Sequence, residues 1–320
     1  MIDVVALGEL LIDFTNVAAD SDGYPTMAAH PGGAPANFLA ALSKYGAKAA
    51  LLGKVGNDTF GKLLVRTLDK AGIATQGLVM SDDVFTTLAF VTLDETGNRE
   101  FAFARKPGAD TKLSFEEIDL ALIDEARVFH FGTLSLTDEP ARTATYKAVA
   151  YAKKNGKLIT YDPNLRKPLW EDLEEAQKQL LWGLGQADVV KISDEEVEFL
   201  FGLGAEDGAK HILSNYGVKL VFVTCGAEGC FFMNENARGY VPSLEGIHVK
   251  DTTGAGDIFG GSAVWKLLHL DKAPAELNES ELTDVARFAC TAAGLSTTRS
   301  GGISSVPEYG EILGKMEKHP

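Results

Sequence analysis

The sequence predicts an α/β protein in which helices cover both faces of a mainly parallel sheet. Short apolar runs rich in β-branched residues alternate with longer runs of helical periodicity over most of the 320 residues, which is the pattern of repeated βαβ units. The hydrophobic content of 45% and the charged content of 23% are those of an ordinary globular protein. The length suits one large domain, or a large domain with a smaller one.

The elements follow from this alternation in chain order. Strands are expected where four to six apolar residues stand together, at residues 4–8, 49–54, 128–131, 158–162, 189–192, 220–225 and 229–233. Helices are expected where the apolar spacing is three to four, at residues 36–44, 61–71, 141–153, 173–183, 195–201, 209–216, 256–269, 281–297 and 309–317.

Two runs, 86–94 and 99–105, break the alternation because both are β-like and only the letters ETGN join them. The apolar residues keep one parity within each run, as for Phe90 in the first and Phe103 in the second. We therefore expect an antiparallel hairpin with one apolar face. Together with residues 13–30 it would form a small projecting sheet, serving as a lid over an active site, as a dimerisation surface, or as both.

Composition excludes several functional classes. The net charge of −15 disfavours a nucleic-acid-binding surface, although backbone donors can hold phosphate within an acidic surface. Three cysteines without CxxC spacing indicate reduced thiols rather than a disulfide scaffold or a zinc site. The N-terminal letters MIDVVALGELLIDF lack the features of a signal peptide, and no apolar run approaches ~18 residues. We expect a cytoplasmic protein without a membrane segment.

The letters DTTGAGD at residues 251–257, followed by a helical run, are the most informative stretch. A small-residue turn that opens a helix leaves backbone N–H groups free and adds the positive end of the helix dipole. Gly254 and Gly256 let a ligand approach the backbone closely. The pattern fits an anion pocket with the Asp257 carboxylate at its rim, suited to phosphoryl transfer onto a hydroxyl. It equally fits an aspartate that caps a helix.

Two common nucleotide motifs are not satisfied. Residues 56–62 match GxxxxGK, but Leu63 stands where a Ser or Thr would bind Mg²⁺, and Phe60 crowds the loop. The first strand ends in GELLID without the GxGxxG turn of a dinucleotide fold. A nicotinamide-dependent oxidoreductase is therefore disfavoured.

The letters PGGAPAN at residues 31–37 combine two glycines with Asn37 at a helix start. Asp13 follows the first strand, where α/β sheets place ligand-binding residues. A carboxylate and an amide can hold neighbouring hydroxyls of a polyol. Alone, the simpler interpretation is that Asn37 caps the helix.

The two segments GGAPANFLAALSKYGAKAALLGKVGNDTFGK and DTTGAGDIFGGS resemble the two signatures of ribokinase-like (pfkB) carbohydrate kinases. The resemblance covers essentially the whole chain and also explains the false P-loop, which belongs to the first signature. Within the family, PGGAPAN, FAFARKPGAD, DPNLRKPLW and KISDEEVEFLFG are most similar to fructokinases.

This resemblance implies a single ribokinase-like domain over 1–320, a three-layer sandwich with a discontinuous β lid at about 13–30 and 86–107. It implies ATP and Mg²⁺ as cofactors, and K⁺ in some members. The roles that it implies are a base (Asp257), an anion hole (Gly254, Ala255, Gly256), sugar-binding residues (Asp13, Gly32, Gly33, Asn37, Arg105, with Arg166 on the phosphate or sugar side), nucleotide-binding residues (Lys191, Thr224, Gly226, Gly229), an indirect Mg²⁺ ligand (Glu196) and a monovalent-cation site (Asp251, Thr253). Ser193 departs from the NxxE motif of the family, whose acid is matched by Glu196.

The expected activity is transfer of the γ-phosphate of ATP to a sugar hydroxyl, with D-fructose as substrate and fructose 6-phosphate as product. A 2-keto-3-deoxygluconate kinase is the nearest alternative, because Arg105 and Arg166 could serve an acidic sugar, and ribokinase is further away. A non-catalytic sugar-binding protein is disfavoured because it needs no base at the phosphate end. The expected partners are a small sugar and ATP, with a homodimer formed through the lid.

Overall fold

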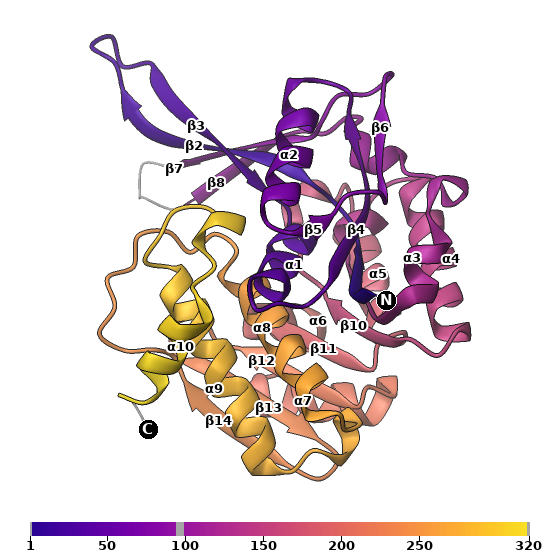
Figure 1. Cartoon of the computed structure of the whole chain (residues 1–320), viewed down its shortest axis with the longest axis vertical. Helices are drawn as coiled ribbons and strands as arrows, with labels where there is room; N and C mark the ends of the chain where they lie inside the picture. The colour runs from indigo at the N-terminus through magenta and orange to yellow at the C-terminus, as the bar shows by residue number, and fades with distance from the viewer. Residues whose placement is uncertain (1, 94–98, 319–320) are drawn as a thin grey trace.

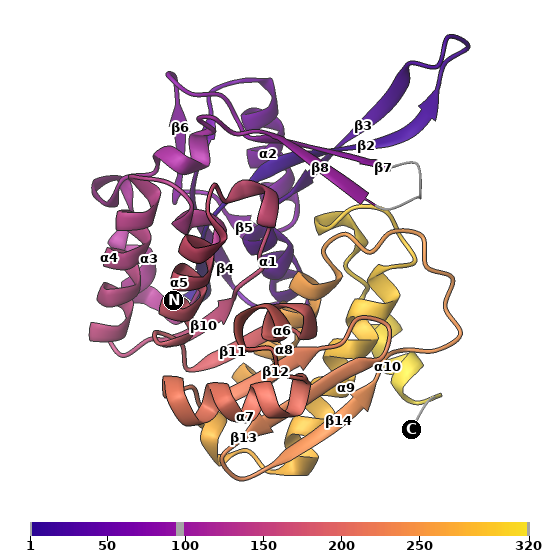
Figure 2. The same ribbon diagram turned by 180° about the vertical axis from the view of Figure 1, so that it is seen from behind.

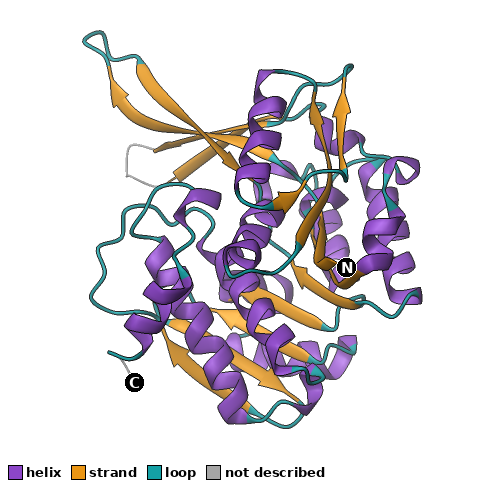
Figure 3. Ribbon diagram, in the orientation of Figure 1, coloured by secondary structure: helices purple, strands orange, loops and turns teal. Residues whose placement is uncertain are grey.

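The computed structural model describes residues 2–93 and 99–318, and a large twisted sheet runs through it (Figures 1 and 3). The strands of this sheet in the described residues are β1 (Ile2–Leu7), β4 (Ala49–Gly56), β5 (Ile73–Ala74), β6 (Leu78–Ser81), β9 (Ala126–Gly132), β10 (Leu158–Asp162), β11 (Val189–Ser193), β12 (Leu220–Thr224), β13 (Gly229–Asn234) and β14 (Arg238–Pro242). Their order is β14-β13-β12-β11-β10-β9-β1-β4-β5, with β6 beside β4. All pairs are parallel except β12–β13 and β13–β14.

Helices cover both faces of this sheet and make three layers. On the face seen in Figure 1 lie α1 (Ala34–Lys44), α2 (Thr59–Lys70), α8 (Ala255–Leu270), α9 (Glu279–Ser296) and α10 (Tyr309–Met316). On the face seen in Figure 2 lie α3 (Leu120–Glu125), α4 (Ala141–Lys154), α5 (Leu173–Leu184), α6 (Asp194–Phe201) and α7 (Ala205–Tyr216). The expected parallel sheet with helices on both faces is confirmed, and each expected helix is present.

Strand β1 shows why a central strand needs apolar residues at every position. Val4 and Ala6 pack into the core beneath α1 and α8, whereas Val5 and Leu7 pack into the core beneath α3 and α4. All four are fully buried. Strands enclosed on both faces therefore appear in the sequence as continuous apolar runs.

A second, small sheet projects from one end of the main body (Figures 1 and 2). It is formed by β2 (Leu11–Ala19), β3 (Pro25–Gly32), β7 (Leu88–Leu93) and β8 (Arg99–Ala104), in the order β3-β2-β7-β8. The expected small projecting sheet is thus present, and we refer to it as the lid sheet. Its two hairpins are antiparallel, while β2 and β7, which join them, pair in parallel.

The expectation that the β7–β8 hairpin has one apolar face is wrong. Phe103 is paired with Ala89, so Phe90 points to the opposite face of the sheet. Phe90 stacks on Phe14, with ring centroids 5.3 Å apart, and Phe14 contacts Phe60 of α2 edge-on. Parity within one run fixes faces only for that strand, and the pairing register fixes them between strands. The expected ETGN turn lies outside the described residues.

Across residues 2–93 and 99–318, no helix has the length and apolar character needed to cross a bilayer.

Candidate active site

Two adjoining cavities open at the carboxyl ends of the parallel strands, which is where sheets of this class bind ligands. The smaller, of about 130 Å³, lies between the main body and the lid sheet, whose Val91 and Phe103 line it. The larger, of about 530 Å³, extends over the ends of β11 and β12 and the start of α8. Both cavities are lined by Asn164, Arg166, Thr252, Gly254 and Asp257.

Asp257 stands where the two cavities meet. Its side chain is 8% exposed, and its Oδ2 accepts a hydrogen bond of 2.9 Å from Asn37 Nδ2. Burial raises its pKa, opposed by the Asn37 hydrogen bond and the charges of Lys191 and Arg166. The N-cap of α8 is Gly254, so Asp257 is the third residue of the helix and does not cap it. The carboxylate is thereby available to the cavities.

The start of α8 has the features of an anion pocket. Gly254 has a φ of 75°, and a Cβ there would lie 3.1 Å from Asn37 Nδ2, so only glycine fits comfortably. A Cβ on Gly256 would lie 2.9 Å from Lys191 Nζ, which places that ammonium directly against the helix start. The backbone N–H of Ala255, expected to form part of the anion hole, donates to Thr252 O at 3.3 Å. This is a long hydrogen bond with which a ligand can compete.

The expected sugar-binding residues Asp13 and Asn37 both line the smaller cavity. Burial raises the pKa of Asp13 to about 6, opposed by the charge of Arg166. The Oδ1 of Asn37 is buried without a hydrogen-bond partner, and such an atom calls for a donor. Gly32 leaves room for Asp13, because a Cβ would lie 2.3 Å from its Oδ2. Gly33 lines the cavity in a left-handed conformation, with φ of 118°.

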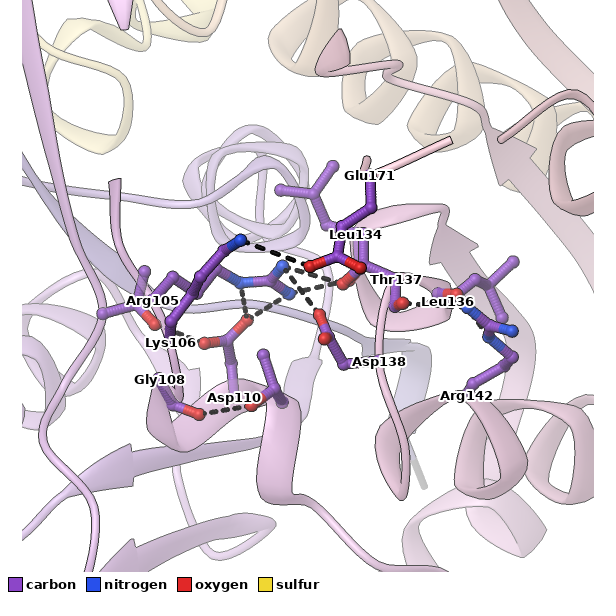
Figure 4. Close-up of polar contacts among 12 residues, drawn as sticks. Arg105, Lys106, Gly108, Asp110, Leu134, Leu136, Thr137, Asp138, Arg142 and Glu171 are labelled. Carbon is purple, nitrogen blue, oxygen red and sulfur yellow. Dashed lines mark hydrogen bonds and ion pairs between the residues drawn. The ribbon is translucent and has the colours of Figure 1, made fainter. Parts of the chain in front are cut away.

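The two expected arginines have different surroundings. Arg166 lines both cavities and acts electrostatically on Asp13 and Asp257. Arg105 lines neither of these cavities. Its side chain is buried behind the cavity wall and pairs with Asp110 (Figure 4). The expected direct contact of Arg105 with the sugar therefore needs correction, because its guanidinium is already engaged.

A buried ion pair lies beneath the anion pocket. Lys191 Nζ stands 3.0 Å from Asp162 Oδ2, and Lys191 lines the larger cavity. Burial works against the ammonium, but the charges of Asp162, Glu196 and Asp257 raise the pKa of Lys191 above its usual value. The group therefore stays positive next to the start of α8, where a phosphate group would lie.

Ser193 and Glu196 explain how the departure from NxxE is accommodated. Ser193 caps α6 and accepts a hydrogen bond from the backbone of Glu196, while Glu196 Oε2 accepts from Ser193 N at 2.9 Å. Glu196 Oε1 accepts from Leu165 N at 2.7 Å. Serine thus supplies the capping oxygen that asparagine would, and the acid keeps its place at the larger cavity.

The remaining expected residues lie at the larger cavity or in the loop before α8. Thr224, Gly226 and Gly229 line the larger cavity. Asp251 accepts hydrogen bonds from Thr253 N and Gly301 N, so its carboxylate braces the loop before α8. In the described residues, no group of three or more acidic, histidine or cysteine side chains could hold a metal by itself.

Sequence reasoning missed several residues that line the cavities, among them the polar residues Glu9 and Asn164. Glu9 lines the smaller cavity, is 3% exposed, and its Oε1 accepts from Ala34 N at 2.7 Å. Asn164 lines both cavities in a left-handed conformation, with φ of 46°. The signals were available, since Glu9 follows the first strand and Asn164 stands in DPN after β10.

Comparisons with known proteins show the family to which the chain belongs. The model of the pfkB family carbohydrate kinases matches residues 1–309. The fructokinase-1 of Zea mays is 42% identical over 98% of each chain. The crystal structure of a fructokinase with bound ATP from Xylella fastidiosa has a TM-score of 0.91 at 30% identity, covering 99% of this chain and 98% of that one. The Vibrio cholerae fructokinase with fructose, ADP and calcium ion has a TM-score of 0.86 at 31% identity, covering 98% of each chain.

Proposed function

Because this chain belongs to the pfkB family of carbohydrate kinases, we propose that it is an ATP-dependent fructokinase that makes fructose 6-phosphate. The observation that carries the proposal is the position of Asp257 where a small and a large cavity meet. A hydroxyl in the small cavity and a phosphate in the large one would both reach it. Similar chains are named fructokinases, one of which binds fructose and ADP.

In the proposed reaction, the Asp257 carboxylate accepts the proton of the attacking hydroxyl. That oxygen forms a bond to the γ-phosphorus while the bond to the bridging oxygen breaks, and ADP leaves. An ordinary aspartate, with a pKa near 4, is a weak base. It suffices because a loose transition state releases the proton late, so the carboxylate mainly orients the attacking oxygen. Burial of Asp257 raises its pKa and strengthens it as a base.

Charge developing on the transferred group would meet three positive elements. These are the N-terminus of α8, the ammonium of Lys191 and the guanidinium of Arg166. Preorganised charge of this kind is usually the largest contribution to such a reaction. Mg²⁺ would neutralise phosphate oxygens when bound, and the lack of a metal cage among the described side chains fits an ion that arrives on the nucleotide. We place the Mg²⁺-directed acid at Glu196 and a monovalent cation such as K⁺ at the loop of Asp251 and Thr253.

The charges of the smaller cavity favour a neutral sugar over a keto acid. Glu9, Asp13 and Asp257 face it, and Arg166 is the cation among the residues that line it. The second cation expected for an acidic substrate, Arg105, is paired with Asp110. A carboxylate would thus meet more repulsion than a polyol, whose hydroxyls can donate to these oxygens and to Asn37 Oδ1.

The test is ADP release, coupled to a second enzyme, with fructose, ribose, 2-keto-3-deoxygluconate and a nucleoside as acceptors. We expect kcat/KM for fructose to exceed each of the others at least tenfold. Turnover with the keto acid alone would overturn the assignment of fructose as substrate but would leave the proposed mechanism unchanged. Absence of turnover with all four would overturn the function.

We also propose that two copies associate through the lid. The β2–β3 hairpin projects beyond the main body (Figure 1), and it exposes 59% of Val17 and 69% of Tyr24. Exposed apolar side chains on a projecting sheet suit a partner surface. Light scattering should give twice the chain mass for the wild type and the single mass for Val17→Asp, and equal masses for both would contradict this interface.

A further inference from the structure

The side chain of Arg105 is the centre of a buried polar cluster at the root of the lid (Figure 4). It follows β8 directly, and 5% of it is exposed. Its Nε donates to Asp110 Oδ2 at 2.8 Å and its Nη1 donates to Thr137 Oγ1 at 2.8 Å. Its Nη2 donates to Leu134 O at 2.8 Å. Nη2 also lies 2.7 Å from Asp110 Oδ2, and these four directional contacts leave the guanidinium little freedom to turn towards a ligand.

Asp110 ties the two ends of one hairpin together. Its Oδ1 accepts from the hydroxyl of Thr87, which directly precedes β7, while its Oδ2 accepts from Arg105, which directly follows β8. The segment that carries it, η1 (Ala109–Lys112), is held to the main sheet because Lys54 of β4 donates to Lys112 O at 3.1 Å. One buried carboxylate thus fixes the root of the lid to the body.

The same cluster supports the wall of the smaller cavity. Leu134, whose carbonyl accepts from Arg105, lines that cavity in the turn η3 (Leu134–Leu136). On the other side, Val91 of β7 and Phe103 of β8 line it from the lid. Glu9 also lines this wall, and the charge of Asp110 raises its pKa while the charge of Arg105 lowers it. The spacing between lid and body therefore depends on Asp110 and its partners.

We propose that Asp110, with Thr87 and Arg105, is a positioning cluster that sets the affinity for the sugar by holding the lid strands at a fixed distance from the cavity wall. None of the three side chains lines the cavity, so they act through Val91, Phe103 and Leu134. The proposal rests on the smaller cavity being the sugar site of the proposed kinase.

The test compares Asp110→Asn and Thr87→Val with Arg142→Lys as the matched control. Arg142 holds the same turn from the other side, through Leu136 O and Thr137 O (Figure 4), and its third hydrogen bond goes to Glu175 of α5 rather than to a lid strand. We expect Asp110→Asn to raise KM for fructose at least tenfold, with KM for ATP within twofold and kcat within threefold. Thr87→Val, which removes one hydroxyl, should raise KM for fructose about threefold. Arg142→Lys should lower the thermal midpoint but leave KM for fructose within twofold.

An unchanged KM for fructose in Asp110→Asn, or an equal rise in Arg142→Lys, would overturn the proposal. If Asp110→Asn does not fold, Thr87→Val decides by the same criteria. If the wild type turns over no sugar, the proposed function fails. Hydrogen exchange then tests separately whether the cluster holds the lid strands. Faster exchange of β7 and β8 amides in Thr87→Val than in Arg142→Lys supports the lid tie, and equal rates overturn it.

Discussion

Replacing Asp257 by asparagine tests the centre of the proposed mechanism. The amide oxygen can still accept the hydrogen bond from Asn37 that the carboxylate accepts now at 2.9 Å. Burial raises the pKa of Asp257, so removing its charge relieves desolvation in the folded state. We therefore expect Asp257→Asn to fold with a thermal midpoint no lower than that of the wild type.

The expected loss lies in the chemical step. A positioned base contributes about 10²–10⁴-fold, which is about 3–6 kcal/mol at ~1.4 kcal/mol per decade. The sugar loses the charge on one hydrogen-bond acceptor, worth about 1–2 kcal/mol. We thus expect kcat for Asp257→Asn to fall by about 10²–10⁴-fold and KM for fructose to rise by about 5- to 30-fold.

Coupled ADP release at saturating ATP gives both constants, and Asp207→Asn is the control. Asp207 stands third in α7, as Asp257 stands third in α8, but it is exposed and lines neither cavity. Its replacement removes the same favourable helix-dipole contact, worth about 0.3–1 kcal/mol, without altering turnover. If Asp257→Asn kept kcat within tenfold of the wild type, the assignment of the base would be refuted.

Three further outcomes follow from individual residues. Glu9 has a pKa raised by burial to about 7, so the folded protein holds a proton that the unfolded chain releases, and stability falls as pH rises from about 4.5 to about 7. In urea unfolding, the free energy of unfolding of Glu9→Gln should thus exceed that of the wild type by up to ~3 kcal/mol at pH 8 and by little at pH 4.5. A gain that does not depend on pH would contradict this. Gly33→Ala puts a Cβ 2.5 Å from Glu9 O at a φ of 118°, and should lower the free energy of unfolding by at least ~3 kcal/mol. Gly310→Ala is the control, because its Cβ would have nothing within 4 Å and should not destabilise the protein. Equal thermal midpoints for the two variants would refute the strain at Gly33. Lys191→Met should lower kcat about 10²-fold in the folded enzyme, because the anion pocket loses its buried cation. A wild-type kcat in this variant would exclude that role.

The parallel core could be predicted because strands covered on both faces have no polar positions. In β12, residues 220–223 are all buried, and such a run appears plainly in the sequence. The edge strand β14 escaped prediction because Arg238, Gly239 and Pro242 interrupt its apolar pattern and its outer side is exposed. Edges are often built in this way, so local pattern carries little signal for them.

The candidate site was predicted where it depends on local sequence and missed where it depends on distant partners. The letters DTTGAGD indicated a helix start with an anion pocket, but aspartate is favoured both as a cap and as a catalytic group there. Only the position of Gly254 at the N-cap separates the two. For Arg105, the sequence placed the residue at the lid, but which carboxylate its guanidinium meets depends on how η1 folds back against the strand.

The distribution of charge in the two cavities explains how an acidic chain, with a net charge of −15, can use ATP. The acids Glu9, Asp13 and Asp257 face the smaller cavity, where a neutral sugar presents hydroxyl donors. Lys191 and the start of α8 face the larger cavity, where phosphate would lie. Asp257 and Arg166 border both, so negative charge that develops during transfer is met on one side by cations and on the other by a proton acceptor. Exchanging these two polarities would repel the nucleotide and leave the hydroxyl without a base, and the separation is therefore what makes directed transfer possible in this fold.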